Sequence, residues 1–219
     1  MLCTSSVQEV MDLAPIAHLA AIKRRIPFLH FFDGFRTSHE IQKIEVWSDE
    51  QLEALLDRSA VDTFRYRGLS PNRPVLRGSA QNPDIFFQER EVANQFYDTL
   101  PRVVEDYMNK INAMIGSNYH LFDYYGDPDA EEVIIAMGSV CDTIEETIDY
   151  LLAKGEKVGL LKVRLYRPFS IKHFLKEIPE TVTKIAVIDR TKEPGAMGEP
   201  LYLDVINAVR GSKFEDALI

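Results

Sequence analysis

The feature that most constrains the fold is a regular alternation of short apolar runs and amphipathic helical patterns between residues 133 and 209. Each apolar run has strand length and is followed by glycine or proline and then by apolar residues at helical spacing. The predicted strands are Val133–Met137, Val158–Tyr166 and Lys184–Asp189, and the predicted helices are Val140–Leu152, Ser170–Leu175 and Gly198–Val209. Strands that alternate with helices in this way are typical of βαβ units. The sequence therefore predicts an α/β fold with a parallel sheet.

The first part of the chain, residues 1–47, is predicted to hold one helix and one strand. Ser6 and Glu9 have the spacing of a capping box, and apolar residues at helical spacing follow them. Pro15 lies inside this pattern and predicts a kink or break just before it, because proline lacks the amide that a helix interior needs. The apolar run Ile26–Phe32 then predicts a strand that is buried on both faces.

Residues 48–119 are predicted to connect the two strand-bearing parts. Ser48 opens a short helix with a second capping box, and a loop rich in proline and glycine follows it. The pattern from Phe86 to Met114 predicts one helix, bent by Pro101. A helical arm without strands usually wraps another domain, so we expect a partner for this arm. Its predicted inward face consists of Phe96, Leu100, Val103, Val104, Tyr107 and Ile111.

Charge, hydropathy and cysteine content exclude several classes of protein. A net charge of -9 does not suit a nucleic-acid surface, which needs clustered Lys and Arg. The longest apolar runs fall far short of the ~20 residues that span a bilayer, and no signal-peptide pattern is visible. Cys3 and Cys141 alone cannot supply the roughly four ligands of a zinc or four-iron site. These features predict a cytoplasmic, soluble chain without a nucleic-acid or membrane partner.

The segment Phe31–Glu40 is the strongest candidate for a functional site. Polar and charged side chains crowd the positions after an apolar run, and ends of strands in α/β folds are where ligands bind. The side chains expected to face an active site are those of Asp33, Arg36, Thr37 and His39. Arg36 could pair with a carboxylate, and Asp33 could orient His39. A direct catalytic role for His39 is the less favoured interpretation.

Two further turns follow predicted strands. Gly138–Ser139 precedes a helix, whose amides and dipole could hold an anion, although a single glycine favours a plain βα turn. The loop Asp189–Glu199 contains two glycines and the cations Arg190 and Lys192, which could meet a phosphate. Its glycine spacing matches neither the P-loop nor the dinucleotide fingerprint. A structural loop at a domain interface is therefore favoured there.

Several long, irregular motifs identify a family that this chain resembles. The motifs are Gln8–Asp12, Phe31–Glu40, Gly78–Asp84, Leu121–Gly126, Ala136–Cys141, Leu165–Ser170 and Asp189–Gly195. Through them the chain resembles pyruvate:ferredoxin (flavodoxin) oxidoreductases over essentially its whole length. The segment Val133–Phe169 is also similar to the C-terminal domain of transketolase-like thiamine enzymes.

The resemblance implies a domain organisation and an activity. It divides the chain into the C-terminal part of a pyrimidine-binding-type domain (1–47), a connector with a helical arm (48–119) and a transketolase C-terminal-like α/β domain (120–219). The implied reaction is the oxidative decarboxylation of pyruvate to acetyl-coenzyme A. The implied cofactors of the whole enzyme are thiamine diphosphate, magnesium and four-iron, four-sulfur clusters. The implied partners are pyruvate, coenzyme A, ferredoxin or flavodoxin, a homodimer partner and the remaining domains.

The chain departs from the family pattern by what it lacks. The Gly-Asp-Gly motif that holds thiamine diphosphate through magnesium is absent from the sequence, as are cluster-binding cysteines. We therefore expect an internal fragment with two unequal lobes, which binds none of these cofactors alone and does not decarboxylate pyruvate. The alternative is an independently folded α/β interaction module without chemistry.

Overall fold

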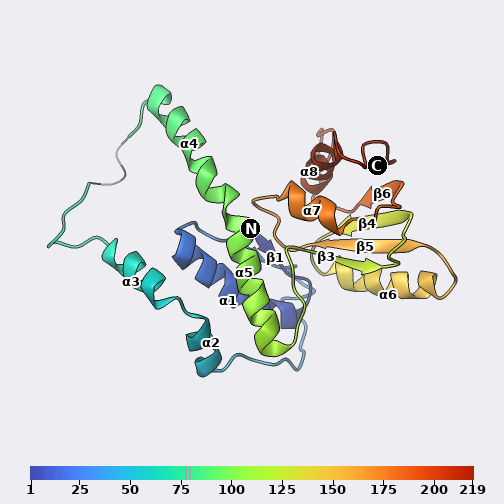
Figure 1. Cartoon of the computed structure of the whole chain (residues 1–219), viewed down its shortest axis with the longest axis horizontal. Helices are drawn as coiled ribbons and strands as arrows, with labels where there is room; N and C mark the ends of the chain where they lie inside the picture. The colour runs from blue at the N-terminus through green and yellow to red at the C-terminus, as the bar shows by residue number, and fades with distance from the viewer. Residues whose placement is uncertain (77, 79) are drawn as a thin grey trace.

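The computed structural model describes residues 1–76, 78 and 80–219, and its strands form two sheets (Figure 1). The larger sheet has the order β3-β5-β4-β6, in which β4 runs parallel to both neighbours and β3 is antiparallel to β5. Its strands are β3 (Phe122–Gly126), β4 (Glu132–Ala136), β5 (Val158–Val163) and β6 (Lys184–Val187). The predicted α/β class is confirmed. The edge strand β3 was not predicted, because its sequence Phe-Asp-Tyr-Tyr-Gly is not an apolar run.

Helices cover both faces of the larger sheet. In Figure 1, α6 (Val140–Leu152) lies on one face, and α7 (Ile171–Glu177) and α8 (Pro200–Val209) lie on the other. Side chains alternate along a strand, so neighbouring residues serve different faces. Leu160 of β5 accordingly packs in the cluster that contains α6, whereas Leu161 belongs to the cluster that contains α7 and α8. The βαβ pattern of the sequence thus places its apolar faces as expected.

The helix α1 (Val7–Arg24) packs against α5 (Leu100–Ile115) and runs without interruption through Pro15. Of the two predicted alternatives, a kink or a break, the break is therefore wrong. A proline at this position leaves the carbonyl of Met11 without its usual helical donor. The indole Nε1 of Trp47 donates to that carbonyl at 3.0 Å, which replaces the missing bond. A contact from another segment thus allows the helix to continue.

The smaller sheet contains only β1 (Leu2–Cys3) and β2 (His30–Phe31), which pair in parallel. The prediction that Ile26–Phe32 forms a strand buried on both faces is wrong. Only two of its residues form the strand, and both are half-buried. Within the described part of the chain, β2 pairs with β1 alone, so no second strand extends the sheet at its other edge.

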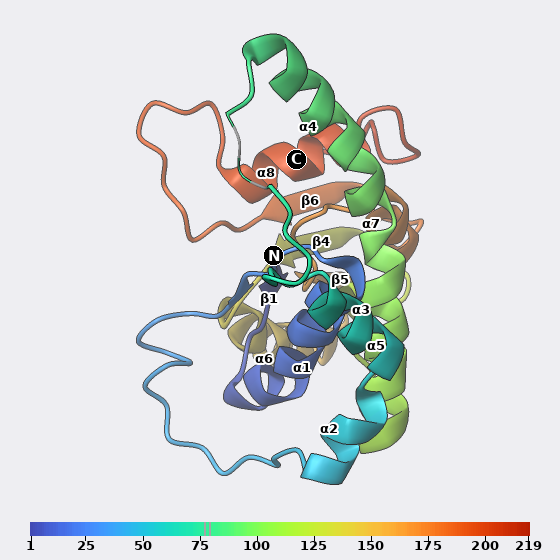
Figure 2. The ribbon, with the colours of Figure 1, turned by 90° about the vertical axis from the view of Figure 1, so that its left-hand side faces the viewer.

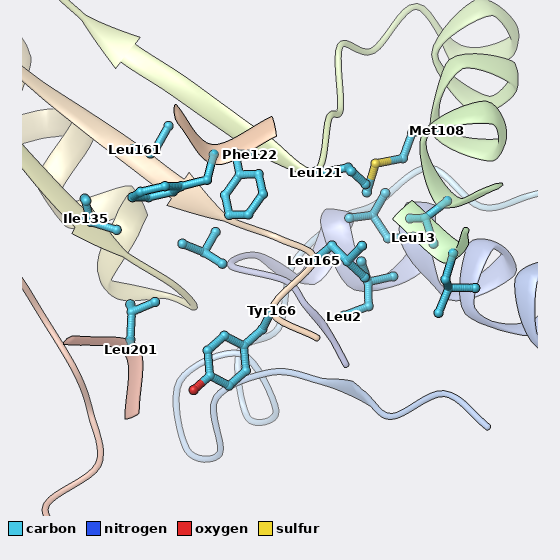
Figure 3. Close-up of a cluster of buried hydrophobic side chains, with 14 of the residues drawn as sticks. Leu2, Leu13, Met108, Leu121, Phe122, Ile135, Leu161, Leu165, Tyr166 and Leu201 are labelled. Atoms are coloured by element: carbon cyan, nitrogen blue, oxygen red, sulfur yellow. The ribbon is translucent and has the colours of Figure 1, made fainter. Parts of the chain in front are cut away.

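The larger of the two hydrophobic clusters connects the helices of the first part with the larger sheet. Figure 3 shows Leu13 and Met108 at one end of this core, Leu2 and Leu165 in its middle, and Leu201 near its other end. The backbone is also joined there, because Cys3 N donates to Arg164 O at 2.8 Å. The two sheets are separate, but the expected lobes share one buried interior. The proposed domain boundaries remain a prediction.

The connector contains α2 (Asp49–Leu55), α3 (Arg58–Tyr66) and α4 (Pro83–Asp98). Both predicted capping-box hydrogen bonds of Ser48 are present. The predicted helix Phe86–Met114 is two helices, α4 and α5, which meet at Thr99, because the proline lies in the first turn of α5 rather than at a bend. Figures 1 and 2 show α4 reaching away from α1.

The two halves of the predicted helical arm differ in how far their apolar side chains are exposed. The predicted inward face is buried in α5, but Phe96 of α4 is 46% exposed, contrary to the prediction. Neither α3 nor α4 buries a residue. The motif Gly78–Asp84 includes Ser79, which lies outside the described residues. Within the described residues, no helix is both long and apolar enough to cross a membrane.

Candidate functional site

Three motifs that are far apart in the sequence meet at the carboxylate of Asp33. Its Oδ2 accepts a hydrogen bond from the backbone amide of Ser139, at the beginning of α6. Its Oδ1 forms an ion pair with Arg190 Nη1 at 2.5 Å, and the same nitrogen lies 3.3 Å from Ser139 Oγ. The Asp33 side chain is 15% exposed and that of Arg190 is 51% exposed. The structure thus joins the Phe31–Glu40 segment to both of the other turns singled out in the sequence.

Gly138 makes this close approach possible. Its φ of +83° lies in the left-handed region, which glycine adopts without strain. A Cβ atom at this position would lie 2.6 Å from Asp33 Oδ2, which is closer than real Cβ contacts come. The glycine is therefore needed by the backbone of the turn and also by the carboxylate packed against it.

The amino ends of the helices that follow β4 and β6 are occupied by carboxylates of the chain itself. Asp33 accepts from the first turn of α6, and Asp189 accepts from the amides of Leu201 and Tyr202 in α8 at 3.3 and 3.0 Å. A helix amino end attracts anions through its free amides and dipole. A phosphate would here meet a fixed negative charge instead of open amides. The structure therefore favours a plain βα turn at Gly138–Ser139.

The turn after Asp33 presents an exposed aromatic pair. Phe35 is 85% exposed and has a φ of 68°, an unusual conformation for a bulky residue. Its ring stacks on that of His39, with the ring centres 5.2 Å apart. Ser38 Oγ accepts from the Phe35 amide at 3.0 Å and lies 2.7 Å from His39 Nδ1. His39 is therefore oriented by Phe35 and Ser38, and Asp33 points to a different part of the molecule.

The remaining two predicted site residues have different surroundings. Thr37 is 6% exposed, and its hydroxyl donates to Ser5 O at 3.2 Å, so it anchors the turn to the loop before α1. Arg36 is exposed. Within the described residues its guanidinium forms neither a hydrogen bond nor an ion pair, so it is free to meet a partner. The structure thus brings Asp33 and Thr37 inward and leaves Arg36 and His39 at the surface.

A buried charge cluster lies beside this turn and was not predicted. Arg164 is 5% exposed and pairs with Glu9 Oε2 at 2.7 Å through Nη1, while its Nε contacts the carboxylate of Asp123. Glu9 also accepts from the amide and hydroxyl of Ser5 at 2.7 and 2.6 Å. The one signal in the sequence was an arginine inside the predicted apolar strand Val158–Tyr166.

Electrostatics favours the charged forms of Glu9 and Arg164 in this cluster. Burial by itself would raise the pKa of Glu9, but Arg164 and the bonds from Ser5 outweigh it and lower the pKa to about 2. The same carboxylates raise the pKa of Arg164, against the opposing effect of its burial. Arg164 therefore holds α1 and β3 against the end of β5 through its ion pairs with Glu9 and Asp123.

The described residues contain no group of three or more His, Cys, Asp and Glu that could hold a metal ion. Cys3 and Cys141 are buried, and burial raises the pKa of each thiol to about 12. A thiolate, which a cluster or zinc ligand must supply, is disfavoured at both positions. With the helix amino ends at α6 and α8 occupied, these residues do not fit a diphosphate, its metal or an iron–sulfur cluster.

Two family models match the chain in succession. Residues 1–109 match pyruvate flavodoxin/ferredoxin oxidoreductase, thiamine diphosphate-binding, and residues 130–218 match core domain II of pyruvate:ferredoxin oxidoreductase. The chain belongs to the pyruvate:ferredoxin (flavodoxin) oxidoreductase family, as its motifs predicted. The first match extends over residues 1–109 and so runs beyond the predicted boundary at residue 47, which stays a prediction.

Individual relatives agree with this family. The chain is 65% identical over its whole length to a pyruvate-flavodoxin oxidoreductase of Enterobacter agglomerans, and 60% identical over 94% of its length to a pyruvate:ferredoxin oxidoreductase of Moorella thermoacetica. It spans 19% and 18% of those proteins, about a fifth of their length.

A solved structure resembles the fold of the chain. The 2-oxoglutarate:ferredoxin oxidoreductase of Magnetococcus marinus, solved with 2-oxoglutarate, coenzyme A and succinyl-CoA, superposes with a TM-score of 0.53 at 16% identity. The match covers 99% of this chain and 38% of that one. At this identity the likeness concerns the fold alone.

Proposed function

We propose that this chain is part of a thiamine diphosphate-dependent pyruvate:ferredoxin or flavodoxin oxidoreductase. The reaction joins the acetyl group of pyruvate to coenzyme A, releases carbon dioxide and transfers two electrons to ferredoxin or flavodoxin. The observation that carries the proposal is the 65% identity to a pyruvate-flavodoxin oxidoreductase over all 219 residues. We further propose that the enzyme works in the cytoplasm.

Within that enzyme, the chain supplies a wall of the active site rather than its acid, base or cofactor ligands. The exposed turn with Arg36 and His39 faces the site, while Asp33 and Thr37 hold the turn in place. The free guanidinium of Arg36 supports this role, since arginine suits a carboxylate such as that of pyruvate. The outward position of both side chains is consistent with a partner that lies on another domain.

Thiamine diphosphate, magnesium and the four-iron clusters bind to other parts of the enzyme. The support is chemical, because the chain offers two buried thiols with raised pKa values and helix ends already filled by Asp33 and Asp189. The cofactors supply the carbanion and electron chemistry of the reaction when bound. This chain forms a wall that helps to enclose the active site, and by itself it does not oxidise pyruvate.

The remaining domains of the enzyme, and its homodimer partner, pack against the helical arm. Large apolar side chains of α4 are exposed, among them Ile85 at 54%, Phe86 at 53% and Phe87 at 68%. A hollow of about 690 Å³ lies between the end of α1 and the helices α3 and α4. Large apolar side chains exposed on a helical arm suit an interaction site.

An independently folded interaction module is the alternative. The core that runs from α1 to α8 (Figure 3) favours it, because such a core could support folding of the chain alone.

A chimera separates the two functions. The corresponding segment of the Enterobacter agglomerans enzyme is replaced by this chain, and pyruvate-dependent reduction of a viologen dye is measured with coenzyme A present. We expect at least half of the parent activity, and no activity from the 219-residue chain alone. A chimera that assembles with normal thiamine and iron content but lacks activity would overturn the proposal, as would activity of the chain alone.

A further inference from the structure

We propose that Asp33 is a positioning residue that latches the exposed turn 34–40 onto the larger sheet. The latch consists of Asp33, the amide of Ser139 and the guanidinium of Arg190. Only its catalytic consequence rests on the proposed function, and the latch itself stands on the geometry.

Asp33 connects the turn to the sheet through two different groups. Its side chain bonds to Ser139 and Arg190, while its backbone carbonyl accepts from the amide of Ser38 at 3.3 Å inside the turn. The strand β2 has already ended at Phe31, so it does not hold the turn. Among the described residues, the Thr37 hydroxyl makes the other hydrogen bond between the turn and the buried interior. The placement of Arg36 and His39 therefore depends on this carboxylate together with the anchor at Thr37.

Two positively charged groups stabilise the carboxylate of Asp33 in the latch. The carboxylate of Asp33 meets the positive end of the α6 dipole on one side and Arg190 on the other. Hydrogen bonds in which one partner is ionised are roughly twice as strong as neutral ones. Figure 2 shows the segments around Asp33 and Arg190 extending on the same side of the molecule. The latch ties the bases of these two segments together, so the turn and the 189–199 loop are held as a unit.

Gly138 turns this geometry into a discriminating test. A methyl group at Gly138 would occupy the space of Asp33 Oδ2, so Gly138→Ala should open the latch without changing any charge. Gly155 provides the matched control. Its φ of +84° is almost the same as the +83° of Gly138. A Cβ atom placed at Gly155 would have nothing within 4 Å. Gly155→Ala therefore reproduces the backbone strain and leaves the latch closed.

The measurement is amide hydrogen exchange of residues 34–40 in the 219-residue chain, with Leu160 and Leu161 of β5 as the internal reference. Because both variants remove a hydrogen bond to a charged group, Asp33→Ala and Gly138→Ala should accelerate exchange in the turn at least about tenfold. Asp33→Asn keeps the shape and an acceptor for Ser139, and it should give a smaller increase. Gly155→Ala and Lys192→Ala, whose lysine pairs with Glu199, should leave the turn unchanged.

The outcomes separate the latch from the proposed function. Unchanged exchange in the turn of Asp33→Asn and Asp33→Ala overturns the latch, and equal acceleration by Gly138→Ala and Gly155→Ala does so too. In the active chimera, Asp33→Asn should lower kcat/KM for pyruvate at least about threefold without lowering the melting temperature. Faster exchange with unchanged kinetics would keep the latch and refute the position of the turn at the active site. If Asp33→Ala also accelerates exchange in β5, the isosteric Asp33→Asn decides.

Discussion

The buried pair between Glu9 and Arg164 gives the sharpest stability prediction. Replacing Glu9 by Gln keeps the shape of the side chain and removes its charge. Arg164, only 5% exposed, would then retain Asp123 as its one carboxylate partner. Removing one member of a buried ion pair is strongly destabilising, because the remaining charge stays buried without full compensation.

The pKa of Glu9 sets the magnitude. It lies at about 2 in the folded chain, compared with the usual 4.5. Each unit of pKa corresponds to 1.36 kcal/mol, so the charged form of Glu9 stabilises the fold by about 3 kcal/mol at neutral pH. We expect Glu9→Gln to lower the free energy of unfolding by a similar amount at pH 7. This would be a large part of the stability of an ordinary domain.

The pH dependence follows from the sign of the shift. Because the folded-state pKa lies below the unfolded value, the stabilisation is complete above about pH 5 and is lost as the pH falls from 4.5 towards 2. Burial raises the pKa of Asp123 in spite of Arg164, so its protonation has the opposite effect on stability. The difference between the parent chain and Glu9→Gln cancels this effect to first approximation. That difference should shrink from about 3 kcal/mol at pH 7 to about 1 kcal/mol at pH 3.

Urea unfolding followed by circular dichroism at both pH values measures the difference. Glu132→Gln is the matched control, because Glu132 pairs with Lys184 where both side chains are more than half exposed. Exposed pairs of this kind contribute about 0–1 kcal/mol. A loss below 1 kcal/mol for Glu9→Gln at pH 7, or a loss that is the same at both pH values, would refute the reasoning.

Two further predictions concern Trp47 and Arg36. Trp47→Phe removes the donor to Met11 O and should cost about 1 kcal/mol of unfolding free energy, whereas in a Pro15→Ala background the cost should nearly vanish, because the restored amide bonds to the same carbonyl. Additive losses in urea unfolding would contradict this account. Arg36→Ala in the active chimera should lower kcat at least about tenfold, as loss of a charge-assisted contact would, with the melting temperature unchanged. Unchanged kinetics would assign the arginine to the surface alone.

Elements whose signals are local were predicted well from the sequence. The strands β4, β5 and β6 and the helix α6 appear where apolar spacing placed them, because period and turn residues act within a few positions. The capping box at Ser48 is complete for the same reason. At α1 the sequence suggested a break that Trp47, 36 residues away from Met11, prevents. Local rules failed where a distant side chain supplied the missing partner.

The candidate site also combines features that the sequence predicted with contacts that only the tertiary structure shows. By itself, the sequence determined the α/β class, the family and the polar segment Phe31–Glu40, because periodicity and motifs are written in consecutive residues. Only the tertiary structure decided that Asp33 points to Ser139 and Arg190 and that Arg164 unites Glu9 with Asp123. These partners lie far apart in the chain, and a buried charge finds its partner through the packing of whole elements. Spacing along the sequence cannot specify such a pair before the elements have been placed against each other.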